Sequence, residues 1–124
     1  MSKERGYDLE ERLIDYSVRV IRLSEALPDS RAGRHVGGQM LRSGTSPAPN
    51  YGEAQAAESR KDFIHKLKIA LKELRETNIW LKVIRKWEMV SPVSRIEPLI
   101  DETDELIAII FASIRTAQNN QEES

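Results

Sequence analysis

The stretch from Gln39 to Phe63, QMLRSGTSPAPNYGEAQAAESRKDF, decides the fold. Wound as a helix at about 100° per residue, it gathers one arginine with short amides, hydroxyls and a carboxylate on a single face. A helix that faced only solvent would carry lysine and glutamate there, so this face predicts a hydrogen-bonded contact between helices or between subunits. We call this set the polar ladder, and its members are Gln39, Arg42, Ser43, Ser46, Asn50 and Glu53.

Arg42 is the only cation of the polar ladder, and the pattern predicts that it is buried at the contact. A buried charge without a partner costs several kcal/mol, so Arg42 needs acceptors. Three carboxylates are candidates: Glu53 of a neighbouring element, Glu73 and Glu76. We therefore expect the ladder to be structural.

The size and composition of the chain indicate one soluble domain. Its 124 residues fit a single domain, 31% of them are charged, and the mean hydropathy is −0.51. No apolar run approaches the roughly 20 residues of a membrane span. The N-terminal segment, MSKERGYDLEE, is too polar for a signal peptide, and the lack of cysteine excludes disulfides and thiolate metal sites. We expect a cytoplasmic protein with no membrane partner.

Apolar residues recur at helical spacing through most of the chain and predict four helices. The predicted ranges are about 8–27, 34–57, 59–87 and 92–117. No hairpin signal and no internal repeat interrupts this pattern. The predicted fold class is all-α, an up-and-down antiparallel four-helix bundle formed by a single domain of residues 1–124.

Capping residues and prolines locate the expected helix ends. Residues that suit an N-cap precede three of the four helices, and they are Asp8, Ser59 and Ser91, the last followed by Pro92. Pro47 and Pro49 lie inside the second helix, where each removes a backbone donor. They predict a bend or a short break near residues 46–50, and two separate short helices are the alternative.

Two helices carry more apolar surface than one core-facing stripe requires. The first helix has a second strip made of Ile14, Val18 and Ile21. The third helix has a second apolar face opposite its core stripe, made of Ile69, Trp80, Val83 and Trp87. This face predicts an interface between subunits, because tryptophan is enriched at such interfaces. The alternative is a wide core that covers both faces.

The net charge of −1 hides a strong asymmetry. Residues 60–87 hold nine basic and three acidic side chains, a net +6, whereas residues 88–124 hold two basic and eight acidic ones, a net −6. Six cations of the third helix share an arc of about 80°, which we call the basic strip: Lys61, Lys68, Lys72, Arg75, Lys82 and Lys86. The strip predicts contact with an anionic partner, with Arg31 and Arg34 as further contributors. The alternative is that it pairs with the acidic fourth helix.

The sequence contains no recognisable catalytic or cofactor motif. It lacks a P-loop and a GxGxxG pattern. His35 and His65 do not stand at metal-ligand spacing, and no HExxH or di-iron Glu-x-x-His pattern occurs. Ser43 and Ser46 have no base within one helical turn. We expect neither an enzyme nor a bound cofactor or metal.

Spaced residues along most of the chain resemble a known bacterial family. The polar ladder, written R-S-G-T-S…N-Y-x-E-A in its central part, is followed by Asp62-Phe63-Ile64, Leu67 and Glu76, with Trp80-Leu81 downstream. This run resembles the four-helix-bundle family of 23S rRNA-intervening-sequence proteins over about residues 9–114. The family usually has one proline before its asparagine, whereas this chain has Pro47 and Pro49.

The resemblance implies four antiparallel helices and a ring-like homopentamer. Some members of the family are encoded inside sequences that interrupt 23S rRNA genes. A related group serves as accessory subunits of retroelements that bind nucleic acid and a reverse transcriptase. No enzymatic activity is attached to the family. The expected partners are therefore other copies of the chain, RNA or DNA, or a nucleic-acid-processing protein. A protein-binding scaffold is the alternative, which the sequence pI of about 6.2 favours.

Overall fold

The computed structural model describes the backbone of residues 2–123 and the side chains of residues 8–120. Within this range the chain is helical and contains no strand, as predicted. The elements are α1 (Ser2–Ala26), α2 (Arg31–Thr45), α3 (Pro47–Gln55), α4 (Arg60–Trp87), the 3₁₀ helix η1 (Val93–Ile96) and α5 (Glu97–Glu123). None of the described helices combines the length and the apolar content that a membrane span needs.

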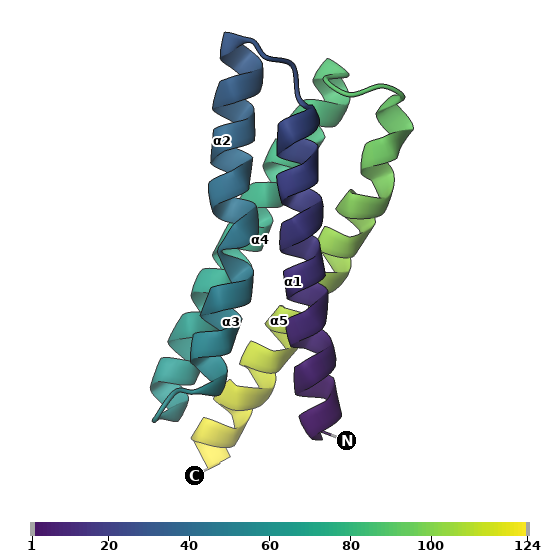
Figure 1. The fold of residues 1–124 in the computed structure, drawn as a ribbon. Coiled ribbons are helices and arrows are strands. Elements are labelled where there is room, and N and C mark those ends of the chain that lie inside the picture. The colour runs from purple at the N-terminus through teal and green to yellow at the C-terminus, as the bar shows by residue number, and fades with distance from the viewer. Residues whose placement is uncertain (1, 124) are drawn as a thin grey trace.

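The helices alternate in direction along the chain. Figure 1 shows α1 running up, α2 and α3 running down as one bent rod, α4 running up and α5 running down. Helix α4 packs against α5 on one side and against α2 and α3 on the other, while α1 packs mainly on α2. Only a light contact joins α1 to α5, so that seam is the least closed side of the bundle.

The predicted bend in the second helix is a division into two helices. Ser46 separates α2 from α3, yet its φ of −78° and ψ of −37° are helical, so the chain bends without leaving the helical region. The cause is the pair of prolines, since neither Pro47 nor Pro49 has a backbone N–H to donate to the preceding turn. Asn50 Nδ2 donates to the carbonyl and the hydroxyl oxygen of Ser46, each at 3.0 Å, and bridges the bend.

Three predicted helix ends are wrong. Helix α1 begins at Ser2, so Asp8 lies inside it and is not the N-cap. Helix α2 begins at residue 31 rather than 34, because Ser30 Oγ accepts a hydrogen bond from the backbone N–H of Gly33 at 3.1 Å. Ser91 caps no α-helix: residues 93–96 form η1, and α5 begins only at Glu97. A proline follows Glu97, and proline is tolerated in the first turn of a helix.

Other predicted features are confirmed. Ser59 caps α4, with its Oγ accepting from the backbone N–H of Asp62 at 3.0 Å. The core is built from the predicted apolar stripes, and its fully buried members include Leu13, Tyr16, Val20, Met40, Leu67, Leu74, Leu81, Ile84, Leu106 and Ile110.

Deep in this core the hydroxyls of Tyr16 and Thr103 hydrogen-bond at 2.7 Å and tie α1 to α5. Burial raises the pKa of the Tyr16 hydroxyl well above its ordinary value.

Candidate functional site

The polar ladder lies where α2 and α3 meet α4. At its centre Ser43 Oγ and Thr77 Oγ1 are 2.7 Å apart, and both residues are fully buried. The Thr77 hydroxyl also lies 2.8 Å from the Glu73 carbonyl. Because Thr77 has one hydroxyl hydrogen, its donation to that carbonyl leaves Ser43 to supply the hydrogen of the inter-helix bond. A buried hydroxyl is thus satisfied on each helix, which joins α2 to α4 without an orphaned polar group.

Arg42 bonds two carboxylates of α4 from the rim of this contact. Its Nη1 donates to Glu73 at 3.0 Å and its Nη2 donates to Glu76. The expectation that Arg42 is buried at a contact between helices of one chain is wrong: its side chain is 53% exposed, because it reaches across the surface to α4. Glu76 also accepts from Trp80 Nε1 at 3.1 Å. The Arg42 hydrogen bond, followed by that from Trp80, lowers the pKa of Glu76.

Two further members of the polar ladder, Asn50 and Glu53, also bond within the chain. Glu53 does not meet Arg42, because it lies eleven residues further along the α2–α3 rod, where its carboxylate pairs with Lys66 of α4 at 2.8 Å. Asn50 bonds Ser46 as described, and Gln39 is half-buried on α2. Three members of the ladder, Arg42, Ser43 and Glu53, therefore form a clamp between α2/α3 and α4.

Sequence reasoning missed one member of this clamp. Thr77 lies three residues after Leu74 and four before Leu81, so helical spacing places it on the buried stripe of α4. A buried hydroxyl on a core stripe needs a partner, and the serine of the neighbouring ladder was the available signal.

The basic strip lies along the exposed side of α4. All six of its side chains are exposed, and among the described residues none forms an ion pair with a carboxylate. The alternative that the strip pairs with the acidic fourth helix is therefore wrong at the level of direct ion pairs. The α4–α5 ion pair in this part of the chain joins Arg85, which is not a strip residue, to Glu97 at 3.1 Å.

The acidic side chains of α5 bond residues that do not belong to the basic strip. Arg12 of α1 donates to both oxygens of Glu102, at 3.1 and 2.7 Å, and lies 3.8 Å from Glu105. Asn78 of α4 donates to Asp104 at 3.0 Å. The Arg12–Glu102 pair closes the lightly packed α1–α5 seam. No local pattern indicates it, because its residues are 90 positions apart.

The predicted interface face of α4 divides into covered and exposed parts. Trp80 and Val83 pack partly against the core, and the Trp80 ring meets the His35 ring edge to face with centroids 6.1 Å apart. Ile69 is half-buried. Trp87 is 71% exposed and nearby Ile79 is 60% exposed. The uncovered apolar surface of α4 therefore lies toward its C-terminal half.

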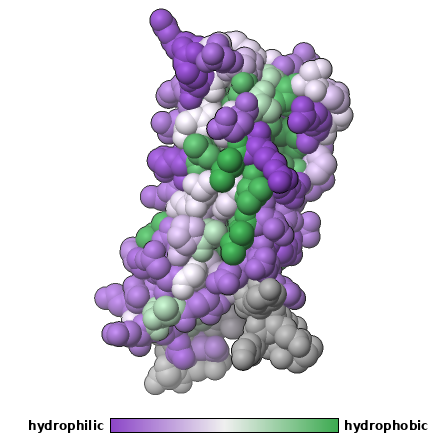
Figure 2. All heavy atoms as spheres, in the orientation of Figure 1, coloured by the Kyte–Doolittle hydropathy of each residue, from purple (hydrophilic) through white to green (hydrophobic). Residues whose placement is uncertain are grey.

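A second uncovered apolar surface lies on α1 and α2. Ile14, Val18 and Ile21 are exposed along α1, and Leu41 is exposed on α2. Figure 2 shows hydrophobic residues gathered in a band on the face that these two helices occupy in Figure 1. The second strip that the sequence predicts on the first helix is thus exposed within a single chain.

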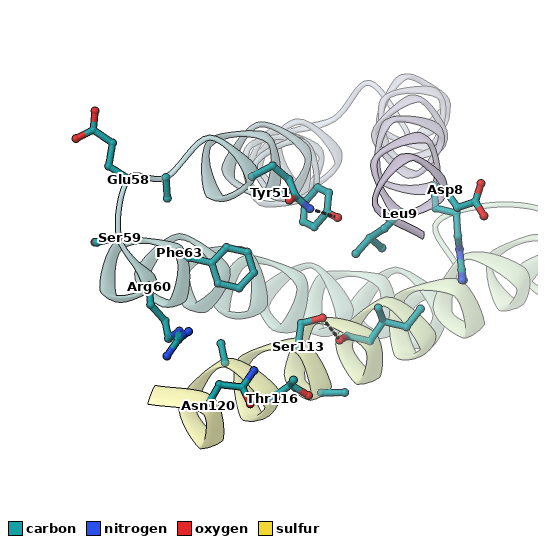
Figure 3. A pocket seen from close by; sticks show the side chains of 16 residues that line it. Asp8, Leu9, Tyr51, Glu58, Ser59, Arg60, Phe63, Ser113, Thr116 and Asn120 are labelled. Carbon is teal, nitrogen blue, oxygen red and sulfur yellow. Dashed lines mark hydrogen bonds between the residues drawn. The ribbon is translucent and has the colours of Figure 1, made fainter. Parts of the chain in front are cut away.

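A hollow of about 1070 Å³ opens between α1, α3, α4 and α5 at the end of the bundle where α3 joins α4. In Figure 3 the rings of Tyr51 and Phe63 and the side chain of Leu9 point toward this space, while Arg60 lies on its α4 side and Asn120 on its α5 side. The walls are largely apolar and the polar groups lie around the rim. Four charged residues, Asp8, Arg12, Glu58 and Arg60, are among those that line the hollow.

The two histidines remain apart on the exposed sides of α2 and α4. Over the described side chains, no group of three or more His, Asp and Glu is placed to hold a metal ion. Ser43 has a hydroxyl partner and not a base. The arrangement that the structure does build is a cationic surface on α4, and the bonds that Arg42, Ser43 and Glu53 of α2 and α3 make to α4 hold that helix in place.

Comparison with known proteins identifies the class and then the family. The fold is matched by a crystal structure of a protein of unknown function from the S23 ribosomal protein family of Bacteroides thetaiotaomicron, with a TM-score of 0.81 and 32% sequence identity over 89% of this chain and 97% of that one. The family model of the 23S rRNA-intervening sequence protein matches residues 7–112. The chain belongs to this family, as the resemblance indicated. No curated protein matches the chain.

Proposed function

We propose that the protein is a non-catalytic, homo-oligomeric accessory protein of the bacterial cytoplasm that binds nucleic acid, RNA in the first place, through the basic strip of α4. The observation that carries the proposal is the strip itself, six exposed cations on one helix with no carboxylate partner in the described part of the chain. The family name, which refers to 23S rRNA, supports RNA as the nucleic acid.

The geometry of the strip suits a phosphate backbone. From Lys61 to Lys86 it extends about 37 Å at 1.5 Å per residue, so it offers successive cations to a linear polyanion. Like charges one helical turn apart, such as Lys68 and Lys72, repel each other slightly. Phosphate contacts relieve that repulsion and release condensed counterions, which is the main source of affinity in sequence-independent binding.

Oligomerisation strengthens such contacts. The apolar strip on α1 and the exposed Ile79 and Trp87 of α4 offer surface for subunit contacts. We infer a ring of identical subunits, and the family resemblance gives five as their number. Each subunit adds one basic strip, so weak contacts act together with a high effective concentration.

The proposal includes no chemical reaction. The Ser43 hydroxyl and the Arg42 guanidinium of the polar ladder are engaged in contacts with α4, where they stabilise the bundle. A scaffold that binds another protein is the competing function, favoured by the exposed acidic side chains of α5, such as Asp101 and Glu105. The two functions predict opposite results with nucleic acid.

The test is a fluorescence-anisotropy titration of the full chain with a structured RNA and a DNA duplex at about 50 mM salt, where phosphate contacts are least screened. Lys68→Glu with Lys72→Glu is expected to weaken binding at least about tenfold. Arg115→Glu is the control for one charge reversal, because Arg115 is exposed on α5, where its guanidinium lies over the Phe111 ring. Arg115→Glu should leave RNA binding nearly unchanged, whereas Lys68→Glu alone should weaken it. Absence of binding by the unaltered protein favours the scaffold.

A further inference from the structure

Three arginines surround a small hollow at the end of the bundle opposite the large one. The hollow measures about 170 Å³ and is lined by residues of α1, η1 and the start of α5. Figure 1 shows these segments at the end of the bundle opposite the junction of α3 and α4. Its lining residues are Arg19, Arg22, Leu23, Arg95, Ile96 and Leu99. The guanidinium-bearing residues come from two segments more than 70 positions apart, and no acidic residue lines the hollow.

No direct ion pair engages this arginine trio within the described part of the chain. None of the three forms an ion pair with a carboxylate there, and Arg95 makes one long contact, 3.5 Å, to the Ser91 carbonyl. Two nearby carboxylates at the start of α5 are engaged elsewhere, Glu97 with Arg85 and Glu102 with Arg12. Arg12, two turns before Arg19 on the same helix, thus has the bidentate partner that the trio lacks.

We propose that the arginine trio binds a phosphate monoester, the terminal phosphate of a nucleic acid strand or of a nucleotide. The planar guanidinium matches phosphate oxygens two at a time, which is why arginine predominates where phosphate is recognised. Leu23, Ile96 and Leu99 add apolar surface to the hollow, while Arg22 and Arg95 are exposed and therefore accessible to an anion from solution.

Size and charge favour a terminal phosphate over a phosphodiester. A hollow of about 170 Å³ holds a single phosphate group but not a stretch of strand. A monoester carries a charge close to −2 above its second pKa of about 6, whereas a diester carries −1. Three guanidiniums therefore match the monoester better. Binding of a strand end rests on the proposed function, whereas binding of a free phosphate group does not.

The first experiment titrates the full protein with inorganic phosphate and with a nucleoside 5′-monophosphate, monitored by NMR chemical shifts. Saturable shifts at residues of α1 and η1 are expected, with affinity that falls between pH 7.5 and pH 5 as the phosphate loses charge. Arg22→Gln and Arg95→Gln are each expected to weaken binding about tenfold, and Arg115→Gln is the control that leaves it unchanged. A circular dichroism melt verifies that each variant is folded. Linear, unsaturable shifts, or equal losses in the control, overturn the proposal.

The second experiment compares 5′-phosphorylated and 5′-hydroxyl forms of one RNA. The phosphorylated strand is expected to bind about tenfold more tightly, and Arg95→Gln is expected to abolish the difference. Lys68→Glu should weaken both strands equally, because it acts on the backbone. If neither RNA binds but free phosphate does, the proposed function fails and the phosphate site stands. If both RNAs bind equally and free phosphate gives no saturable response, the site fails and the proposed function stands.

Discussion

Single residues set how closely the helices approach. Ser43 and Thr77 place two hydroxyls where α2 crosses α4, and Gly44, next to Ser43, lets the other side of α2 approach α1. A Cβ on Gly44 would lie 2.6 Å from Val20 Cγ1, well inside van der Waals contact. Within α2, Ser43 thus bonds α4 through its hydroxyl, and Gly44 packs closely on α1 because it has no side chain.

Gly44→Ala is expected to destabilise the protein by about 1–3 kcal/mol, because the buried Val20 side chain must move to accept the methyl group. The loss outweighs the gain of about 1 kcal/mol in helix propensity. Gly38→Ala is the matched control, since a Cβ there meets nothing within 4 Å. Urea unfolding should give Gly38→Ala a free energy of unfolding equal to or above that of the unaltered protein, and Gly44→Ala a lower one. A Gly44→Ala protein of undiminished stability contradicts the close α1–α2 contact.

Arg42→Ala is expected to lower the melting temperature by a few degrees at pH 7. The bond from Arg42 lowers the pKa of Glu76 in the folded state. The stability that this bond contributes is therefore present above the ordinary pKa of 4.5 and is lost as the pH falls through the pKa of the folded state. The difference between the two proteins should therefore narrow below pH 4.5. Melting curves recorded from pH 7 to pH 3 measure it, and a constant difference would show that Arg42 acts by packing alone.

At the scale of elements, the hydrophobic periodicity of the sequence located the helices. Their ends differ from the predicted ones because local hydrogen bonds set them. The apolar stripes of α4 and α5 are strong because each continues for several turns, so their existence could be predicted. The start of α2 depended on Ser30, and η1 replaced a predicted α-helical turn. The prolines at positions 47 and 49 indicated a break but not its geometry, because Ser46 stays helical.

The candidate sites were predictable only where one helix carries them. Helical spacing suffices to place the basic strip and the polar ladder on their faces. It does not say how near the next helix lies, which is why Arg42 was expected to be buried and is half exposed. The arginine trio was not predicted, since Arg19 and Arg95 are 76 positions apart in the sequence and line one hollow only in the folded chain.

At the scale of the whole molecule, apolar surface remains uncovered on more than one side. The exposed strip on α1, together with Ile79 and Trp87 of α4, is wider than scattered surface residues explain. Trp80, by contrast, already contacts His35 and Glu76 within its own chain. Subunit contacts are therefore expected to involve the α1 strip and the C-terminal half of α4 more than Trp80.

Val18→Glu and Trp87→Glu are expected to reduce the oligomer to smaller species while helicity is preserved, because each places a charge on an exposed apolar surface. Light scattering at micromolar concentration measures the mass, and circular dichroism measures the helicity. Ala32→Glu, an exposed position outside these surfaces, is the control and should leave the mass unchanged. A monomer in the unaltered protein would exclude the proposed ring.

The salt dependence of RNA binding tests the central claim most directly. Each phosphate neutralised on a single strand contributes about −0.7 to the slope of log K against log salt concentration, so five or six strip cations predict a slope of about −3.5 to −4.2 per strand contact. Lys68→Glu with Lys72→Glu removes two contacts and should make the slope shallower by about 1.4. A slope near zero, or a slope that this pair of substitutions leaves unchanged, would contradict a nucleic-acid interface on the basic strip.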